Sequence, residues 1–353
     1  MAKKVLHIIS TLDPGGVEKW LIDLIKIDNN NEHHILCISG NKGSWFDKLD
    51  RVHLTPNVTK GKLRFLFGLR SFIEAYDYDI IHCHLYRFSA LIRLFNIGSS
   101  KAFIAHSHND KRNEIREKNN LRKLIEYIYS SFSKFVFELF ETIKLAASND
   151  AGKDLFGKKA IFKIIHCGIG IGDIPLLGLR NEDKKNKKFV TVGSLTHQKN
   201  HEFIIRLFRN LDENYSLYII GKGPKSNELQ ELINKLGLNH RVYLAGVKED
   251  IINHLRNYDG FLFPSRYEGL GLSFIEAQAA GLPCIISDKI PIEADVVKGN
   301  IKRLSLDSES EWVEAIKLSS PKIDAFSSHK KCVESDFNIF IANKKLAELY
   351  EKI

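Results

Sequence analysis

The stretch GFLFPSRYEGLGLSFIE, residues 260–276, indicates both the fold and the chemistry of this chain. It starts with an apolar run typical of a buried strand, passes through a loop with two glycines, and opens a helix. A helix N-terminus presents unpaired N–H groups and the positive end of its dipole, and both suit a phosphate. Gly269 and Gly271 let the backbone come close to a ligand because they carry no side chain. The stretch therefore predicts a phosphate-binding loop after a buried strand.

A carboxylate stands at each end of this loop, Glu268 before the glycines and Glu276 on the following helix. Each has a simpler explanation when taken singly. Glu276 gains ~0.3–1 kcal/mol from the helix dipole, and Glu268 is compatible with a solvated loop residue. Together they offer acceptors for hydroxyl groups such as those of a ribose and a hexose. Beside a phosphate-binding loop, they predict a nucleotide-sugar site.

Apolar strand-like runs alternate with helical patterns along the whole chain, which has 353 residues and therefore room for two domains. This alternation predicts two doubly wound α/β domains, each with a parallel sheet. Their boundary falls in the glycine-rich and then charged stretch 168–188. The strand-like runs are 5–9, 35–38, 79–83, 102–106, 143–147 and 162–165, then 189–192, 216–220, 241–244, 260–263 and 284–286. The helical patterns include 17–27 and 121–140, then 200–210, 226–236, 250–257 and 272–280.

The Glu-x7-Glu stretch resembles the signature of the retaining glycosyltransferases of family 4, in the same strand, loop and helix context. The flanking segments 264–267 and 279–283 match as well. The resemblance implies the GT-B fold, two Rossmann-like domains that face a cleft. Residues 1–170 would bind the acceptor, helped by a C-terminal helix at about 335–353 that crosses back to them. Residues 171–334 would bind the donor, with contacts from Gly269, Leu270, Gly271 and Leu272, with Glu268 positioning the sugar and Glu276 the ribose.

Lys199 follows the strand 189–192 and precedes a helix, which is an unfavourable place for a cation unless a bound anion lies there. A solvated surface lysine is the simpler alternative. The resemblance implies that Lys199 binds the donor diphosphate. Many relatives carry arginine directly after the glycine, where this chain has Ser194, so Lys199 or Arg266 would carry more of that charge. The resemblance also implies that Gly221 lies near the diphosphate and that the Val247 main chain faces the base.

The first half matches more loosely. The loop at Ser10–Val17 follows the first strand, and the resemblance implies that Gly16 faces the donor. Two His-x-His pairs, His82 to His84 and His106 to His108, end strands and could suit a metal. No third ligand is spaced to join either pair, so metal-free histidines are the favoured interpretation. The resemblance implies that a histidine here contacts the transferred sugar, and we favour His108 over His106.

The charge and composition limit the partners. Residues 1–175 hold 26 Lys and Arg against 19 Asp and Glu, and the remainder 26 against 24, which gives +7 and +2 of the net +9. No zinc-finger spacing or RNA-binding motif accompanies the basic half, so nucleic acid is not expected. The basic and aromatic segments 60–70 and 111–123, with the apolar pattern 121–140, suit an anionic membrane surface, although a solvated basic face explains them as well.

Five scattered cysteines and the absence of a signal peptide or an apolar run of ~18 residues predict a cytoplasmic protein, peripheral on the inner face of the plasma membrane. We predict a retaining glycosyltransferase of cell-surface polysaccharide synthesis, as in bacterial capsule, exopolysaccharide or lipopolysaccharide. It would move a sugar from a nucleotide-diphosphate sugar to a lipid-linked glycan, with Lys199, Glu268 and His108 as catalytic residues and without a cofactor or required metal. The alternatives are a nucleotide-sugar epimerase or phosphorylase on the same fold, and a non-catalytic nucleotide-sugar-binding protein.

Overall fold

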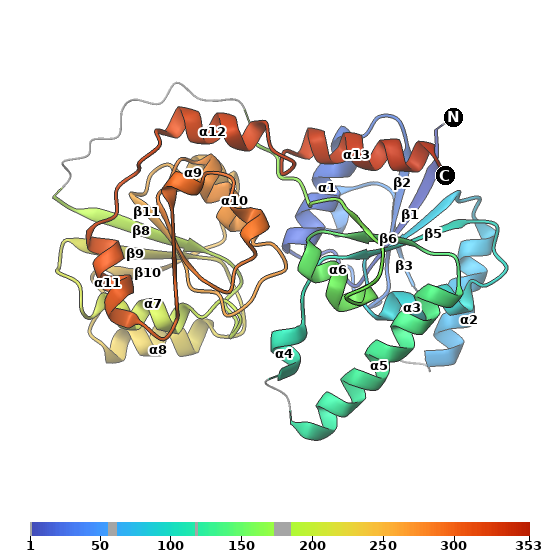
Figure 1. The fold of residues 1–353 in the computed structure, drawn as a ribbon, viewed down its shortest axis with the longest axis horizontal. Helices are drawn as coiled ribbons and strands as arrows, with labels where there is room; N and C mark the ends of the chain where they lie inside the picture. Colours follow the sequence, from blue (N-terminus) through green and yellow to red (C-terminus); the bar gives the residue numbers. More distant parts are fainter. Residues whose placement is uncertain (1, 56–61, 117–118, 173–184) are drawn as a thin grey trace. The chain divides into compact units, whose positions relative to one another are not determined.

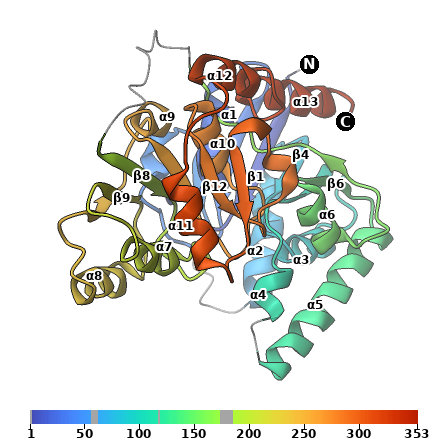
Figure 2. The ribbon, with the colours of Figure 1, turned by 60° about the vertical axis from the view of Figure 1, so that its left-hand side comes forward.

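The computed structural model describes residues 2–55, 62–116, 119–172 and 185–353, and the chain divides into two compact units. The first unit combines Met1–Gly170 with Ile339–Ile353, and the second is Ile171–Asn338. Each unit is a parallel sheet with helices on both faces (Figures 1 and 2). The predicted pair of doubly wound α/β domains is confirmed.

Seven parallel strands in the described part of the first unit form a sheet of order β3-β2-β1-β4-β5-β6-β7. The order reverses between β1 and β4. The short strand β3 was not predicted, because a three-residue run with a central histidine has no strand pattern. The strands are β1 (Lys4–Ile9), β2 (Glu32–Cys37), β3 (Val52–Leu54), β4 (Ile80–Cys83), β5 (Ala102–Ser107), β6 (Ile143–Ala146) and β7 (Lys163–Ile164). The helices are α1 (Gly16–Ile27), the 3₁₀ turn η1 (Phe46–Lys48), α2 (Lys62–Ala75), α3 (Phe88–Phe95), α4 (Arg112–Arg116), α5 (Asn120–Leu139), α6 (Asn149–Phe156) and α13 (Ile339–Glu351).

The two faces of this sheet differ in chemistry. On one face, aliphatic residues such as Leu6 and Ile8 pack with side chains of α2, α3, α5 and α6 into an apolar core. The alternate residues of the same strands point the other way, and they include many histidines. We call the side chains of His7, His33, His82, His84, His106 and His108 the histidine face.

Helices α1 and α13 cover the histidine face. Trp20 of α1 lies against the rings of His84, His106 and His108 with centroid distances of 5.6–5.9 Å. The hydroxyl of Tyr350 on α13 is hydrogen-bonded to Nδ1 of His82 at 2.7 Å. The predicted return of the C-terminal helix to the first domain is therefore confirmed, with the helix beginning at Ile339.

The second unit has a six-stranded parallel sheet in its described residues, of order β10-β9-β8-β11-β12-β13, which reverses between β8 and β11. Strand β13 was missed because two of its four residues are cations. The strands are β8 (Lys187–Val192), β9 (Tyr215–Ile220), β10 (Val242–Gly246), β11 (Gly260–Phe263), β12 (Cys284–Ser287) and β13 (Ile301–Leu304). The helices are α7 (His201–Phe208), α8 (Ser226–Lys235), α9 (Ile251–Leu255), α10 (Leu272–Ala279), η3 (Ile292–Ala294), η4 (Lys298–Asn300), α11 (Glu309–Lys317) and α12 (Ala325–Val333).

Candidate functional site

Two predicted site residues, Lys199 and Glu268, meet in the second unit. Lys199 lies in the loop after β8 and Glu268 in the loop after β11, and Nζ of the lysine is 2.6 Å from Oε1 of the glutamate. Only 15% of the Lys199 side chain and 7% of the Glu268 side chain are exposed. The strand order reverses between β8 and β11, and such a reversal is where open α/β sheets bind ligands.

Hydrogen bonds tie the two loops together. The Arg266 N–H donates to the Gln198 carbonyl at 2.8 Å, and the Gln198 side-chain amide donates to the Tyr267 carbonyl at 2.9 Å. The Arg266 guanidinium donates to the Asn200 side chain at 3.0 Å. Asn200 has a positive φ of 53° and turns the chain directly into α7. Lys199 and Glu268 are therefore held by a braced pair of loops.

The Lys199 side chain is packed closely and only partly exposed. Its Nζ lies 5.1 Å from the centre of the Phe263 ring, within reach of a cation–π interaction. Its aliphatic stem passes over Gly193, where an added Cβ would lie 3.0 Å from Cε of the lysine. Burial, with a smaller contribution from Lys199, lowers the pKa of neighbouring His201 to about 3, so that imidazole is neutral.

The glycine of the loop after β9 allows a tight crossing of backbones. A Cβ at Gly221 would lie 1.9 Å from the Gly193 carbonyl oxygen, and the φ of Gly221 is +149°. Its N–H donates to the Gly246 carbonyl at 2.8 Å, which links the ends of β9 and β10. Val247 follows directly and is 52% exposed. Gly221 and Val247 thus lie in loops at the same edge of the sheet as Lys199.

The N-terminus of α10 lies beside the ion pair in sequence and is bound to the end of β8. Gly271 caps the helix with a φ of +86°, and the Ser273 hydroxyl donates to the Val192 carbonyl at 3.0 Å. Gly269 and Leu270 are buried in front of it, and Leu272 and Glu276 are half-buried on the helix. The first N–H groups of a helix have no acceptor within it, so this end can donate to an anion.

In the first unit, Gly16 is exposed and is the first residue of α1. The loop that leads to it follows β1, next to which the strand order of the sheet reverses. His108 is 7% exposed, and both of its ring nitrogens have partners. Nε2 lies 2.8 Å from Nδ1 of His84, and Nδ1 lies 3.2 Å from Sγ of Cys167. Burial, and then the nearby His106, keep the pKa of His108 well below its usual value, so the ring is neutral. The contact of His108 with a sugar stays a prediction that these bonds do not favour.

The expectation that no third ligand joins either His-x-His pair was wrong. His7 of β1 lies with His82 and His84, and His84 lies with His106 and His108, in groups whose ligand nitrogens are within 4.8 Å of one another. Spacing along the chain could not reveal this, because β1 is far from β4 in sequence. The parallel register that sets His7 opposite His82 brings them together.

The sequence also holds an Asp-x-Asp pair, Asp77 and Asp79, and carboxylates are the ligands that hard divalent ions prefer. Asp79 directly precedes β4, at the amino end of the strand, and its carboxylate accepts from the Lys4 N–H at 2.8 Å. The ligand-binding loops of a parallel sheet leave the opposite edge. This pair is therefore in the wrong place to hold a donor diphosphate.

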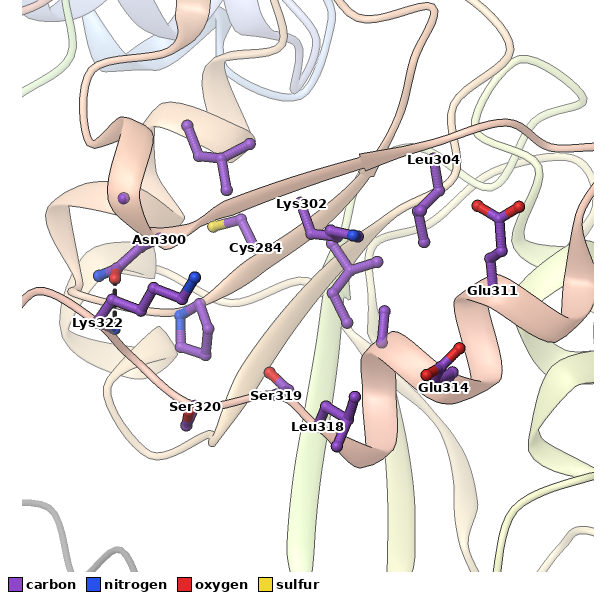
Figure 3. A pocket seen from close by; sticks show the side chains of 15 residues that line it. Cys284, Asn300, Lys302, Leu304, Glu311, Glu314, Leu318, Ser319, Ser320 and Lys322 are labelled. Carbon is purple, nitrogen blue, oxygen red and sulfur yellow. Dashed lines mark hydrogen bonds between the residues drawn. The ribbon is translucent and has the colours of Figure 1, made fainter.

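A surface pocket of about 360 Å³ lies elsewhere in the second unit (Figure 3). It is lined by the starts of β12 and β13 and by the end of α11, and the Lys322 N–H donates to Asn300 at its rim. It contains none of the predicted site residues. It also lies at the amino edge of the sheet, away from the glycine loops.

The exposure expected of the segment 60–70 is found in part. Phe65 is buried at 7% exposure, whereas Phe67 is 61% exposed; Arg70 is paired with Glu74, and Lys60 lies outside the described residues. The first half of α5 instead exposes a row of apolar side chains, and α5 reaches past the sheet in Figures 1 and 2. The exposed residues are Leu121 at 68%, Leu124 at 55%, Ile125 at 57%, Tyr127 at 71% and Ile128 at 59%. None of the helices in the described residues is long and apolar enough to cross a bilayer.

Comparison with known proteins agrees with the fold. The crystal structure of Anabaena Alr3699/HepE in complex with UDP and glucose superposes with a TM-score of 0.77, at 17% identity, over 99% of this chain and all of that one. The fold is thus the GT-B fold, as predicted.

Relatives by sequence extend along most of the chain. The capsular polysaccharide biosynthesis glycosyltransferase CapH of Staphylococcus aureus is 27% identical over 99% of this chain and 98% of its own length. The UDP-Gal:alpha-D-GlcNAc-diphosphoundecaprenol alpha-1,3-galactosyltransferase of Escherichia coli is 24% identical over 81% of this chain and 79% of its own. Residues 180–320 match the family Glycosyl transferases group 1. This match lies in the second unit, and together with the relatives it supports a glycosyltransferase of polysaccharide biosynthesis.

Proposed function

We propose that the protein transfers a sugar, with retention of its anomeric configuration, from a nucleotide-diphosphate sugar to a hydroxyl of a lipid-linked glycan. The observation that carries this proposal is the 2.6 Å contact of Lys199 with Glu268 at the switch point of the second sheet. Residues 69 positions apart supply a cation for a diphosphate and a carboxylate for sugar hydroxyls at one place. Retention of the anomeric configuration is inferred from the resemblance to the retaining glycosyltransferases of family 4.

The main demand of this reaction is to stabilise the charge that develops on the leaving nucleoside diphosphate. The Lys199 ammonium group and the N-terminus of α10 are the groups that we assign to it. In the structure Lys199 is paired with Glu268, so a bound diphosphate would share or replace this carboxylate as the partner of the ammonium group. Glu268 would then be free to accept hydrogen bonds from the donor sugar.

The other donor contacts follow the edge of the same sheet. We assign the ribose to Glu276, the diphosphate to the backbone near Gly221 and at Gly269–Leu272, and the base to the main chain of Val247. Gly16, in the first unit, is a further donor contact that we propose from the resemblance to family 4. Binding of a nucleotide sugar is supported by Anabaena Alr3699/HepE, which was crystallised with UDP and glucose.

The acceptor and the location are also proposals. The E. coli relative is named for a diphosphoundecaprenol-linked acceptor, which supports a lipid-linked glycan here. Such an acceptor lies at a membrane, and the exposed apolar row on α5 is flanked by the exposed cations Arg122 and Lys123. We therefore propose peripheral attachment of the first unit to the inner face of the plasma membrane. The whole function is tested by a mass-spectrometric screen of donors against lipid-diphosphate acceptors, with the anomeric configuration of the product read by NMR.

Replacing Lys199 by alanine should lower turnover by ~10²–10³, the effect of losing one preorganised charge-stabilising group. Steady-state kinetics of a folded variant would measure it, and Lys235→Ala, which removes an exposed lysine of α8, is the matched control. Circular dichroism must accompany the kinetics, because the change leaves the buried Glu268 carboxylate without its cation. Turnover of folded Lys199→Ala within a few-fold of the parent would remove Lys199 from the diphosphate site.

Glu276→Ala should raise the KM for the donor and leave kcat almost unchanged, because a contact to the ribose is present both before and during transfer. Glu231→Ala on the exposed side of α8 serves as the control. A collapse of kcat at constant KM would show that the assignment to the ribose is wrong.

Chelation should leave most of the transferase activity intact, since Lys199 and the end of α10 can balance the diphosphate charge. The measurement is the initial rate in EDTA with and without added Mg²⁺ or Mn²⁺. Activity that disappears in EDTA and returns with either of these ions would contradict a metal-free diphosphate site.

The protein should bind vesicles that contain anionic lipid and ignore purely zwitterionic ones. Removing both cations in Arg122→Gln/Lys123→Gln should weaken binding at low salt, by about 1 kcal/mol for each charge. Leu124→Ser/Ile128→Ser should remove the part of the binding that persists at high salt. Vesicle flotation measures both, and Ile161→Ser, at a 92% exposed position of the first unit outside α5, is the control. Equal flotation of all these variants would contradict docking through α5.

A further inference from the structure

Apart from the predicted contact of His108 with the donor sugar, the histidine face has no assigned role in the proposed transfer. It nevertheless gathers five buried imidazoles and the half-buried His84 in one layer. Burial, the largest cause, keeps the pKa values of His7, His82, His84 and His108 well below the usual value, so these rings are neutral. A neutral imidazole has one donor and one acceptor nitrogen. Burying several of them is costly unless each nitrogen has a partner.

Hydrogen bonds join these rings into two hydrogen-bonded series. The first runs from Asp28 to His33 at 2.9 Å, to His7 at 2.9 Å and to His84 at 3.0 Å. It continues from His84 Nδ1 to His108 Nε2 at 2.8 Å.

The second series runs from Tyr350 to Nδ1 of His82 at 2.7 Å, and from Nε2 of His82 to Nδ1 of His106 at 3.1 Å. It ends at Nε2 of His106. This nitrogen is buried and makes no hydrogen bond of good geometry, although the Ile165 main chain lies near the ring. A buried nitrogen left in this way calls for a partner.

His84, His106 and His108 each offer one nitrogen, and these three ligand atoms lie within 4.8 Å of one another. Two imidazole nitrogens on one tetrahedral Zn²⁺ lie about 3.3 Å apart, since each Zn–N bond is about 2.0–2.1 Å. The observed spacing therefore needs only small movements to hold an ion. We propose that His84, His106 and His108 form a binding site for a transition-metal ion such as Zn²⁺, through Nδ1 of His84 and Nε2 of the other two.

The outer hydrogen bonds fit this assignment, because each ligand keeps a partner for its second nitrogen. His84 donates from Nε2 to His7, His7 donates to His33, and His33 donates to the Asp28 carboxylate. Burial would raise the pKa of Asp28, but hydrogen bonds from His33 and from the neighbouring asparagines lower it to about 2, so it is ionised. The Asp28 carboxylate, at the end of the hydrogen bonds that run through His33 and His7, would offset part of the charge of a cation bound at this site.

The other two ligands are supported in the same way. His106 donates from Nδ1 to His82, which donates to the Tyr350 oxygen, and His108 donates from Nδ1 to the sulfur of Cys167. The competing group of His7, His82 and His84 is less suitable. It would require a nitrogen of His82 and would break its bond to Tyr350 or to His106. The proposed site gives up only the bond between His84 and His108, and both of these nitrogens become ligands.

The three ligand nitrogens determine which metal ions this site can bind. Three neutral imidazoles suit Zn²⁺, Co²⁺, Ni²⁺ or Cu²⁺, whereas Mg²⁺ and Mn²⁺ prefer oxygen ligands. Three protein ligands leave a fourth position for water. The site lies within the first unit and does not depend on the proposed transfer, and a test with Mg²⁺ or Mn²⁺ does not address it.

The test uses the full chain without a histidine tag, stripped of metal and titrated with Zn²⁺ or Co²⁺. Elemental analysis after desalting should give one ion per chain, and bound Co²⁺ should show the visible absorption of a four-coordinate complex. Cu²⁺ should quench Trp20, whose ring centre is 5.6–5.9 Å from those of the three ligands. Trp20→Phe should abolish most of this quenching while the stoichiometry stays at one.

His84→Gln and His106→Gln should each lower the affinity for Zn²⁺ at least tenfold. The control is His240→Gln, an exposed histidine that pairs with Glu213 in the second unit. If the parent protein binds no ion above background, the proposal is wrong. It is equally wrong if one ion binds but is lost only in His240→Gln, or if binding leaves Trp20 fluorescence unchanged. The parent measurements decide the matter even when a histidine variant fails to fold.

Discussion

In a parallel sheet the carboxyl ends of all strands lie at one edge. Where the strand order reverses, the loops that follow the two neighbouring strands lead to opposite faces of the sheet and leave room for a ligand between them. Both units of this protein obey that constraint. In the second unit the reversal lies between β8 and β11, and the loops that leave there carry Lys199 and Glu268. In the first it lies between β1 and β4, beside Gly16 and His84. The positions of the candidate site residues therefore follow from where the strand order reverses in each sheet.

Much of this could be predicted from the sequence, because the signals are local. The apolar run before Glu268, the two glycines and the helix behind them are contiguous, and their order alone indicates a strand, a phosphate loop and a helix. Lys199 was identified because a cation before a helix N-terminus is unfavourable without an anion. Strands β3 and β13 were missed because three or four residues, with a histidine or with cations among them, carry too little pattern.

Contacts between distant segments could not be predicted. The ion pair of Lys199 with Glu268 depends on β8 and β11 being neighbours, which no local pattern states. His7 joins the pair His82 and His84 for the same reason, through the pairing of β1 with β4. Phe65 was expected on the surface because cations surround it in sequence, yet the α2 register turns it into the apolar core.

The C-terminal helix has a consequence for the order in which the protein is made. Helix α13 belongs to the first unit, but the ribosome synthesises it after the whole second unit. Until Tyr350 emerges, His82 lacks its hydroxyl partner and one covering helix of the histidine face is missing. The second unit is contiguous in sequence and can fold as soon as it has been synthesised. The first unit begins earlier and is completed only when α13 docks onto it.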